Sequence, residues 1–117
     1  MLNIGLNQVS AVLGATYGVF STIQETLKLA DAAMREVIAV SAKAGINLRE
    51  EDIEEAHKVL RTLSAGGKTS MLQDIEAGRK TEVEMLSGVL REMGRKYGVP
   101  TPVNDTLFRM IRTLEQI

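Results

Sequence analysis

Two asparagines near the start of the chain have the spacing of neighbours on one helix face. Asn3 and Asn7 lie four residues apart in the otherwise apolar stretch MLNIGLNQVSAVLG, and residues four apart share a face of an α-helix. Asparagine is a poor helix former, so two amides at this spacing call for polar partners. Two interpretations stay open. Either the amides are buried and bonded to a neighbouring helix, which the pattern favours, or they line a ligand pocket.

A second group of chemically capable side chains lies in the stretch KTSMLQDIEAGRKTEVEM. Ser70 and Gln73, and again Thr81 and Glu84, have capping-box spacing, in which a hydroxyl accepts from a backbone N–H and the partner side chain reaches back. Two closely spaced helix starts are therefore predicted. Glu82 is not needed for either box. A carboxylate there gains about 0.3–1 kcal/mol from the helix dipole, so its presence does not by itself require a function.

Residue type and spacing exclude several other sites. His57, the single histidine, lies on a charged stretch that indicates a surface or boundary position. The letters GGKT at residues 66–69 lack the upstream glycine and the preceding β-strand of a phosphate-binding loop. The acidic residues 50–55 lack the glycine and ligand spacing of a calcium loop. We therefore expect no metal site and no nucleotide site of these kinds.

Length and charge narrow the class of protein. A chain of 117 residues suits one domain with one core. Its net charge of −1 gives no electrostatic reason to propose nucleic acid or an anionic membrane as a partner. There is no cysteine, hence no disulfide framework. The apolar start has no basic region and carries polar residues, unlike a signal peptide or a membrane span, so a cytoplasmic protein is expected.

The elements that must position these side chains are helical. Apolar residues recur at intervals of three and four, and no stretch alternates with a period of two. Aromatic residues make up only 3% of the chain, which indicates a core of aliphatic side chains and methionine. The stripes predict a single all-α domain of about six helices, over residues 2–13, 23–41, 53–63, 71–75, 83–93 and 107–114.

Several linked motifs resemble the C-terminal helical domain of ketopantoate reductase (2-dehydropantoate 2-reductase). The family pattern is a Ser-Ser-Met-x-Gln-Asp start, a Gly-Arg-x-Thr-Glu turn, and Gly-x-Pro-x-Pro-x-Asn before the last helix. The chain has TSMLQD at residues 69–74, GRKTE at 78–82 and GVPTPVN at 98–104. The pair Asn3 and Asn7 and the letters ATYG at 15–18 also fit. The resemblance covers nearly the whole chain and is least distinctive over residues 43–65.

The resemblance implies an all-α fold like the C-terminal domain of 6-phosphogluconate dehydrogenase. It also implies a reductase that converts 2-dehydropantoate to (R)-pantoate with NADPH, on the route to pantothenate and coenzyme A. Residues 1–117 would form the substrate-binding and dimerisation domain. NADP would be bound mainly by an N-terminal Rossmann domain that is absent from this sequence.

The same motifs imply roles for four residues. Asn3, Asn7 and Ser70 would bind the substrate, and Glu82 would contact the nicotinamide end of the cofactor or the reacting centre. The two predicted helix starts would then form two edges of the active-site cleft. In this family the general acid is a lysine, which stands four residues before the asparagine that Asn3 matches. The position of this lysine would lie before Met1. The fragment alone is therefore expected to be inactive.

Two alternatives stay open. The chain could be a stand-alone helical interaction or dimerisation module derived from the reductase. It could also be the same domain of a reductase for another 2-oxo acid, because Tyr17 stands where some family members have an asparagine. A homodimer is expected in either case.

Overall fold

Seven α-helices and one π-helical turn make up the fold of residues 1–117 in the computed structural model. They are α1 (Leu2–Leu13), α2 (Tyr17–Thr22), α3 (Gln24–Lys43), α4 (Glu50–Thr62), α5 (Ser70–Glu76), η1 (Glu84–Gly88), α6 (Val89–Tyr97) and α7 (Pro102–Leu114). The all-α prediction is confirmed, and there is one α-helix more than the six stripes indicated. None of the helices is both long and apolar enough to cross a membrane.

The additional helix is α2, which the apolar pattern does not reveal. It is only six residues long, and Phe20 is its one buried residue, so no repeating stripe marks it. Ile23 was expected to open the long second helix. It instead lies in an extended conformation between α2 and α3 and is largely exposed.

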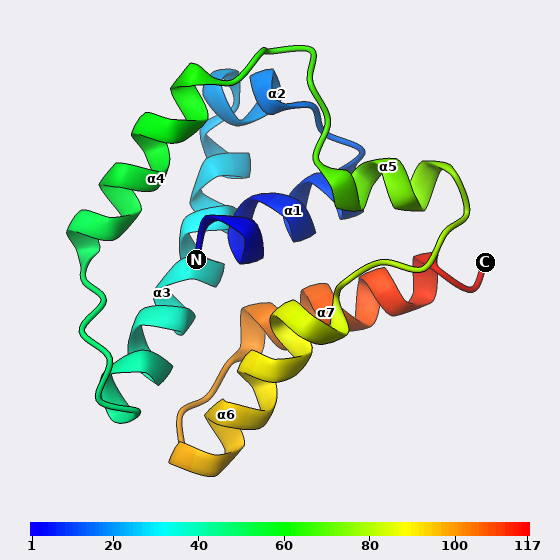
Figure 1. Ribbon diagram of the computed structural model, residues 1–117. Helices are drawn as coiled ribbons and strands as arrows, with labels where there is room; N and C mark the ends of the chain where they lie inside the picture. The colour runs from blue at the N-terminus through cyan, green and yellow to red at the C-terminus, as the bar shows by residue number, and fades with distance from the viewer.

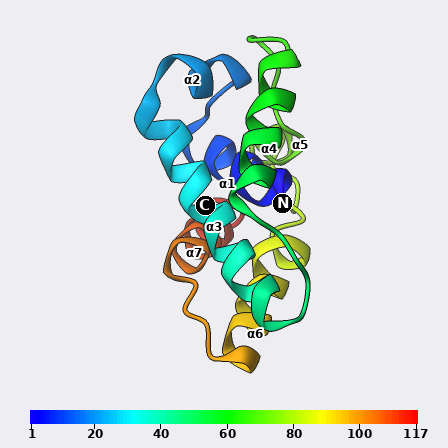
Figure 2. The same ribbon diagram turned by 90° about the vertical axis from the view of Figure 1, so that its left-hand side faces the viewer.

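Helix α1 lies at the centre of the molecule and packs against α3, α5 and α7 (Figure 1). Helix α4 flanks α3 on the outside, and α6 and α7 form a neighbouring pair. The view turned by 90° shows a flattened shape (Figure 2), with extents of 37 × 33 × 19 Å. The shortest extent matches about two layers of helices.

The main apolar cluster joins α1 to α3 and to the neighbouring helices. Its buried members are Leu6, Val9, Ala15, Phe20, Ala30, Ala33, Leu60 and Leu107. Gly5 permits a close approach of α1 to α3, because a Cβ atom there would lie 2.7 Å from the carbonyl oxygen of Ala30. A larger residue at Gly5 would push the two helices apart.

Helix α4 is attached to α3 by a smaller set of contacts. Ile53 and Ala56 pack against Met34. His57 Nε2 lies 2.7 Å from Asp31 Oδ1, which places the single histidine at the boundary between core and solvent, as the sequence indicated.

Candidate functional site

Asn3 and Asn7 both lie on α1, and neither is buried. Asn3 is exposed and Asn7 is half-buried. Neither side chain forms a hydrogen bond within the protein, so the favoured interpretation of buried amides bonded to another helix is wrong. The buried amide of α1 belongs to the next residue, Gln8, which is 0% exposed. The two asparagine amides are therefore free to bind a ligand.

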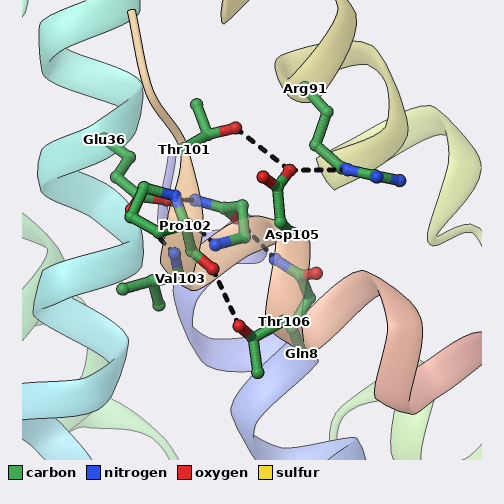
Figure 3. Close-up of polar contacts among 9 residues, drawn as sticks. Gln8, Glu36, Arg91, Thr101, Pro102, Val103, Asp105 and Thr106 are labelled. Atoms are coloured by element: carbon green, nitrogen blue, oxygen red, sulfur yellow. Dashed lines mark hydrogen bonds and ion pairs between the residues drawn. The ribbon is translucent and has the colours of Figure 1, made fainter.

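Gln8 and Asn104 together fix the position of α1. Figure 3 labels Gln8 close to the first turn of α7. Gln8 Nε2 donates to Ile4 O at 2.8 Å and to Asn104 Oδ1 at 2.9 Å. Asn104, also 0% exposed, donates from Nδ2 to Ala33 O on α3 at 3.1 Å. Because one amide pair links α1, α3 and α7, it restrains the rotation of α1 that presents Asn7.

Glu36 of α3 caps the start of α7 in the same network. Its carboxylate accepts from the backbone N–H groups of Val103 and Asn104, at 2.8 and 2.9 Å, and from Asn104 Nδ2 at 2.8 Å. Pro102 occupies the first turn of the helix, where its missing N–H costs nothing. Gln8, Glu36 and Asn104 were not singled out as candidates from the sequence. Pro102 and Asn104 belong to the GVPTPVN motif, but the motif does not indicate the contacts of Asn104 with Gln8 and Glu36.

The start of α5 differs from the predicted capping box. Thr69, not Ser70, is the N-cap, and its Oγ1 accepts from Leu72 N at 3.1 Å. Thr69 also bonds to Ser10 of α1, whose Oγ donates to Asn7 O at 2.9 Å. Ser70 becomes the first helical residue, and its hydroxyl is exposed and unbonded. The chain of hydroxyls places Ser70 beside the part of α1 that carries Asn7.

The second predicted capping box is also wrong. Thr81 Oγ1 accepts from Val83 N at 3.2 Å, two residues on rather than three. The backbone N–H of Thr81 donates to Glu115 Oε2 at 2.7 Å, and Glu84 instead pairs with Arg112 at 2.8 Å. A π-helical turn begins at Glu84, and such turns are frequent at functional sites. Just before this turn, the carboxylate of Glu82 is exposed and has no ion-pair partner.

A small apolar cluster brings three of the four candidate residues to neighbouring positions. Ala11, Met71, Val83 and Ile111 pack together. Ser70 and Glu82 directly precede Met71 and Val83, respectively. Asn7 lies one turn before Ala11 on the same face of α1.

Asn3 lies one further turn away along α1. The main surface cavities are lined by other residues, and none of the four candidate residues is among them. We call Asn3, Asn7, Ser70 and Glu82 the candidate face.

The candidate face offers hydrogen-bonding groups of complementary kinds. The amides both donate and accept, the hydroxyl does the same, and the carboxylate accepts. None of them is engaged inside the protein. Such a set can bind a small molecule that carries hydroxyl, oxo and carboxylate groups.

Tyr17 supports the loop that leads into α5. Its backbone N–H donates to Gly67 O at 3.0 Å. Its ring lies against Gly67 so closely that a Cβ atom there would come within 2.9 Å of the ring carbons. Tyr17 thus contacts the loop two residues before Thr69.

Comparison with known proteins identifies relatives over almost the whole chain. The sequence model of the family described as "Ketopantoate reductase PanE/ApbA C terminal" matches residues 1–115. The chain is 33% identical to a 2-dehydropantoate 2-reductase of Pyrobaculum aerophilum, covering 99% of this chain and 41% of that protein. A 2-dehydropantoate 2-reductase of Aquifex aeolicus is also 33% identical, with 97% and 37% covered. The chain thus spans about two fifths of the length of these relatives.

Solved structures show the same fold. A PanE/ApbA family ketopantoate reductase from Ralstonia eutropha JMP134 superposes with a TM-score of 0.87 at 25% identity, over 97% of this chain and 38% of the other. A D-mandelate dehydrogenase with bound NADH and anilino(oxo)acetate gives a TM-score of 0.89 at 26% identity, over 97% and 38%. With the linked motifs and the helical fold, these matches show that the chain belongs to the ketopantoate reductase family and corresponds to its C-terminal part.

Proposed function

We propose that residues 1–117 form the substrate-binding side of the cleft in an NADPH-dependent 2-dehydropantoate 2-reductase. This enzyme would make (R)-pantoate for pantothenate and coenzyme A biosynthesis. The observation that carries the proposal is that Ser70 and Glu82, which have no partner within the protein, directly precede two members of one apolar cluster, and that Asn7 lies one turn before a third. The names of the relatives support the reaction.

The amides of Asn3 and Asn7 and the hydroxyl of Ser70 would hold the substrate. A 2-oxo acid offers a carboxylate and an oxo oxygen, and both accept hydrogen bonds. Donors already fixed on helices stabilise the negative charge that develops on the oxo oxygen during reduction. Because Gln8 and Thr69 hold α1 and α5 by hydrogen bonds, the helices that carry these donors would be positioned before the substrate arrives.

Glu82 is this chain's proposed contribution to the cofactor site. The chain contains no β-strand, so it has no dinucleotide-binding fold of its own, and NADP would be bound mainly by an N-terminal Rossmann domain. An exposed, unpaired carboxylate fits a hydrogen bond to the amide or a ribose hydroxyl at the nicotinamide end. NADPH supplies a hydride when bound. The lysine that the resemblance implies as proton donor is not within residues 1–117.

A reductase for another 2-oxo acid is the second candidate function. The D-mandelate dehydrogenase that shares this fold was solved with NADH and anilino(oxo)acetate. Tyr17 also differs from the asparagine of some family members, and it supports the loop beside Ser70. A bulkier 2-oxo acid is therefore the alternative substrate for the site.

The test uses the full-length protein that contains this chain and follows NADPH oxidation with 2-dehydropantoate. Asn7→Ala and Glu82→Ala should each lower kcat/KM by about tenfold or more, which corresponds to roughly 1.4 kcal/mol. Asn47→Ala and Glu54→Ala are matched controls, because both residues are exposed and unpaired and lie away from the candidate face. The controls should leave kcat/KM unchanged.

Three further measurements separate the alternatives. Turnover of benzoylformate, the oxo acid of mandelate, without turnover of 2-dehydropantoate would keep the fold assignment and replace the substrate. Full activity in both Asn7→Ala and Glu82→Ala would refute the candidate face. The 117-residue chain alone should not oxidise NADPH. If it does so, and Glu82→Ala does not change the rate, the activity comes from a contaminating reductase.

A further inference from the structure

A cavity of about 280 Å³ lies where the end of α2, the start of α3 and the C-terminal half of α4 meet. Its apolar wall is formed by Phe20, Leu27 and Leu60. Phe20 and Leu60 are buried members of the main cluster, against which Leu27 packs. The wall is therefore part of the core, and it provides a fixed apolar surface that opens to solvent.

The rim of this cavity carries four polar side chains. Ser21 and Gln24 come from the α2–α3 junction, and His57 and Arg61 lie one turn apart on α4. The side chains of Ser21, Gln24 and Arg61 form no hydrogen bond within the protein. Arg61 also has no carboxylate within ion-pair distance, whereas Arg35, Arg79, Arg91 and Arg112 each have one.

His57 is the fixed member of the rim. Its Nε2 atom lies 2.7 Å from Oδ1 of Asp31, whose side chain is only 11% exposed. This contact holds the ring in place and leaves Nδ1 without a partner in the protein. The cavity therefore combines a free guanidinium, an oriented imidazole and an apolar wall.

The geometry points to a binding site for a small organic carboxylate with a compact apolar group. The carboxylate would bind Arg61, whose planar guanidinium matches it in a bidentate pair. It would also lie beside His57, while the apolar group would rest on Phe20, Leu27 and Leu60. The volume of about 280 Å³ lies just below the range of about 300–1,000 Å³ for ligand pockets, so the expected ligand is small, about the size of benzoate. The inference is independent of the proposed reductase function.

A purely structural role explains only part of this arrangement. The contact between His57 and Asp31 also fastens α4 to α3, and that alone would account for the pair. It does not involve Arg61, Gln24 and Ser21, which are exposed and lie around the same apolar wall without a partner in the protein. A ligand with one anionic end and one apolar end could use Arg61 and the apolar wall at the same time.

The test titrates the full chain with benzoate and, separately, with benzamide, its uncharged analogue, and follows backbone amide signals by NMR. We expect benzoate to shift signals at the end of α2, the start of α3 and the C-terminal half of α4. We expect it to bind about tenfold more tightly than benzamide. Arg61→Gln should weaken benzoate binding by about tenfold. Lys58→Gln makes the same charge change on the same helix but outside the cavity, and should leave the affinity within about twofold.

A further variant tests the cavity without changing its charge. Ser21→Trp places a large ring at the exposed rim and should abolish binding while the fold is retained. Several results would overturn the inference: no benzoate binding by the wild type, equal affinity for benzamide, equal losses in Arg61→Gln and Lys58→Gln, or unchanged binding in Ser21→Trp. Equal losses in the two charge variants would indicate general attraction to positive charge.

Discussion

Two buried serines differ in whether their hydroxyl groups have hydrogen-bond partners. Ser10 and Ser87 are both 0% exposed. The hydroxyl of Ser10 donates to Asn7 O and bonds to Thr69, and so joins α1 to the start of α5. The hydroxyl of Ser87, in the π-helical turn, has no hydrogen-bond partner. A buried hydroxyl with partners stabilises the fold, whereas one without partners carries an uncompensated desolvation cost.

Alanine at each of these two serines should therefore have different effects. Ser10→Ala should lower the free energy of unfolding by about 1–2 kcal/mol, because it removes one bond within α1 and one bond from α1 to the start of α5. Ser87→Ala should leave it unchanged or raise it slightly, because no bond is lost. Urea denaturation of the two variants and the wild type measures both values. An equal loss in Ser87→Ala would show that its hydroxyl bonds to an internal water molecule.

At the scale of elements, periodicity predicts the helices that bury a stripe, and it cannot predict contacts between distant parts of the chain. The stripes locate α1, α3, α4 and α7 correctly, because each of these helices buries a regularly spaced apolar face. Spacing alone allows either Thr69 or Ser70 to cap α5, and Ser10 of α1 decides in favour of Thr69. The partner that caps α7, Glu36, is also remote in sequence. Which residue caps each of these helices therefore depends on tertiary packing.

The four residues of the candidate face come from the family motifs, whereas the hydrogen bonds that hold α1 in place were not predicted from the sequence. The motifs of the family identified Asn3, Asn7, Ser70 and Glu82, and the structure leaves all four free of internal partners. The amide that holds α1 in place, Gln8, has no recognisable local pattern. Its role is visible only once Asn104 is placed beside it. The binding roles of Asn3, Asn7, Ser70 and Glu82 are a proposal.

The cap of α7 by Glu36 gives a prediction at this scale. Glu36→Ala removes the acceptor of two backbone N–H groups and of the Asn104 side chain. Bonds to a charged acceptor contribute about 1.5–3 kcal/mol, so the first turn of α7 should fray. Hydrogen exchange should accelerate at residues 103–106 and change little in α4. Glu54→Ala, at an exposed and unpaired glutamate, is the control, and unchanged protection of α7 in Glu36→Ala would refute the capping role.

The molecule as a whole is a thin slab. The polar candidate face and an apolar groove lie at different places on its surface. The candidate face lies along α1, α5 and the turn before η1. A groove of about 330 Å³ lies between α1 and α7 and is lined in part by Val12, Met110 and Leu114. Leu13, also exposed, follows at the end of α1. A slab of 19 Å thickness leaves part of its apolar side chains exposed, and this groove is one place where they gather.

We expect a second copy of the chain to cover the groove between α1 and α7, which gives a homodimer. Met110→Lys places a charge in the groove and should convert the dimer to a monomer, because a buried ammonium without a partner is strongly unfavourable. Met85→Lys is the matched control, since Met85 is 75% exposed and lies on η1, outside the groove. Sedimentation at several concentrations distinguishes the two states. A wild-type monomer throughout would refute the dimer, and a dimer lost only in Met85→Lys would move the interface to η1.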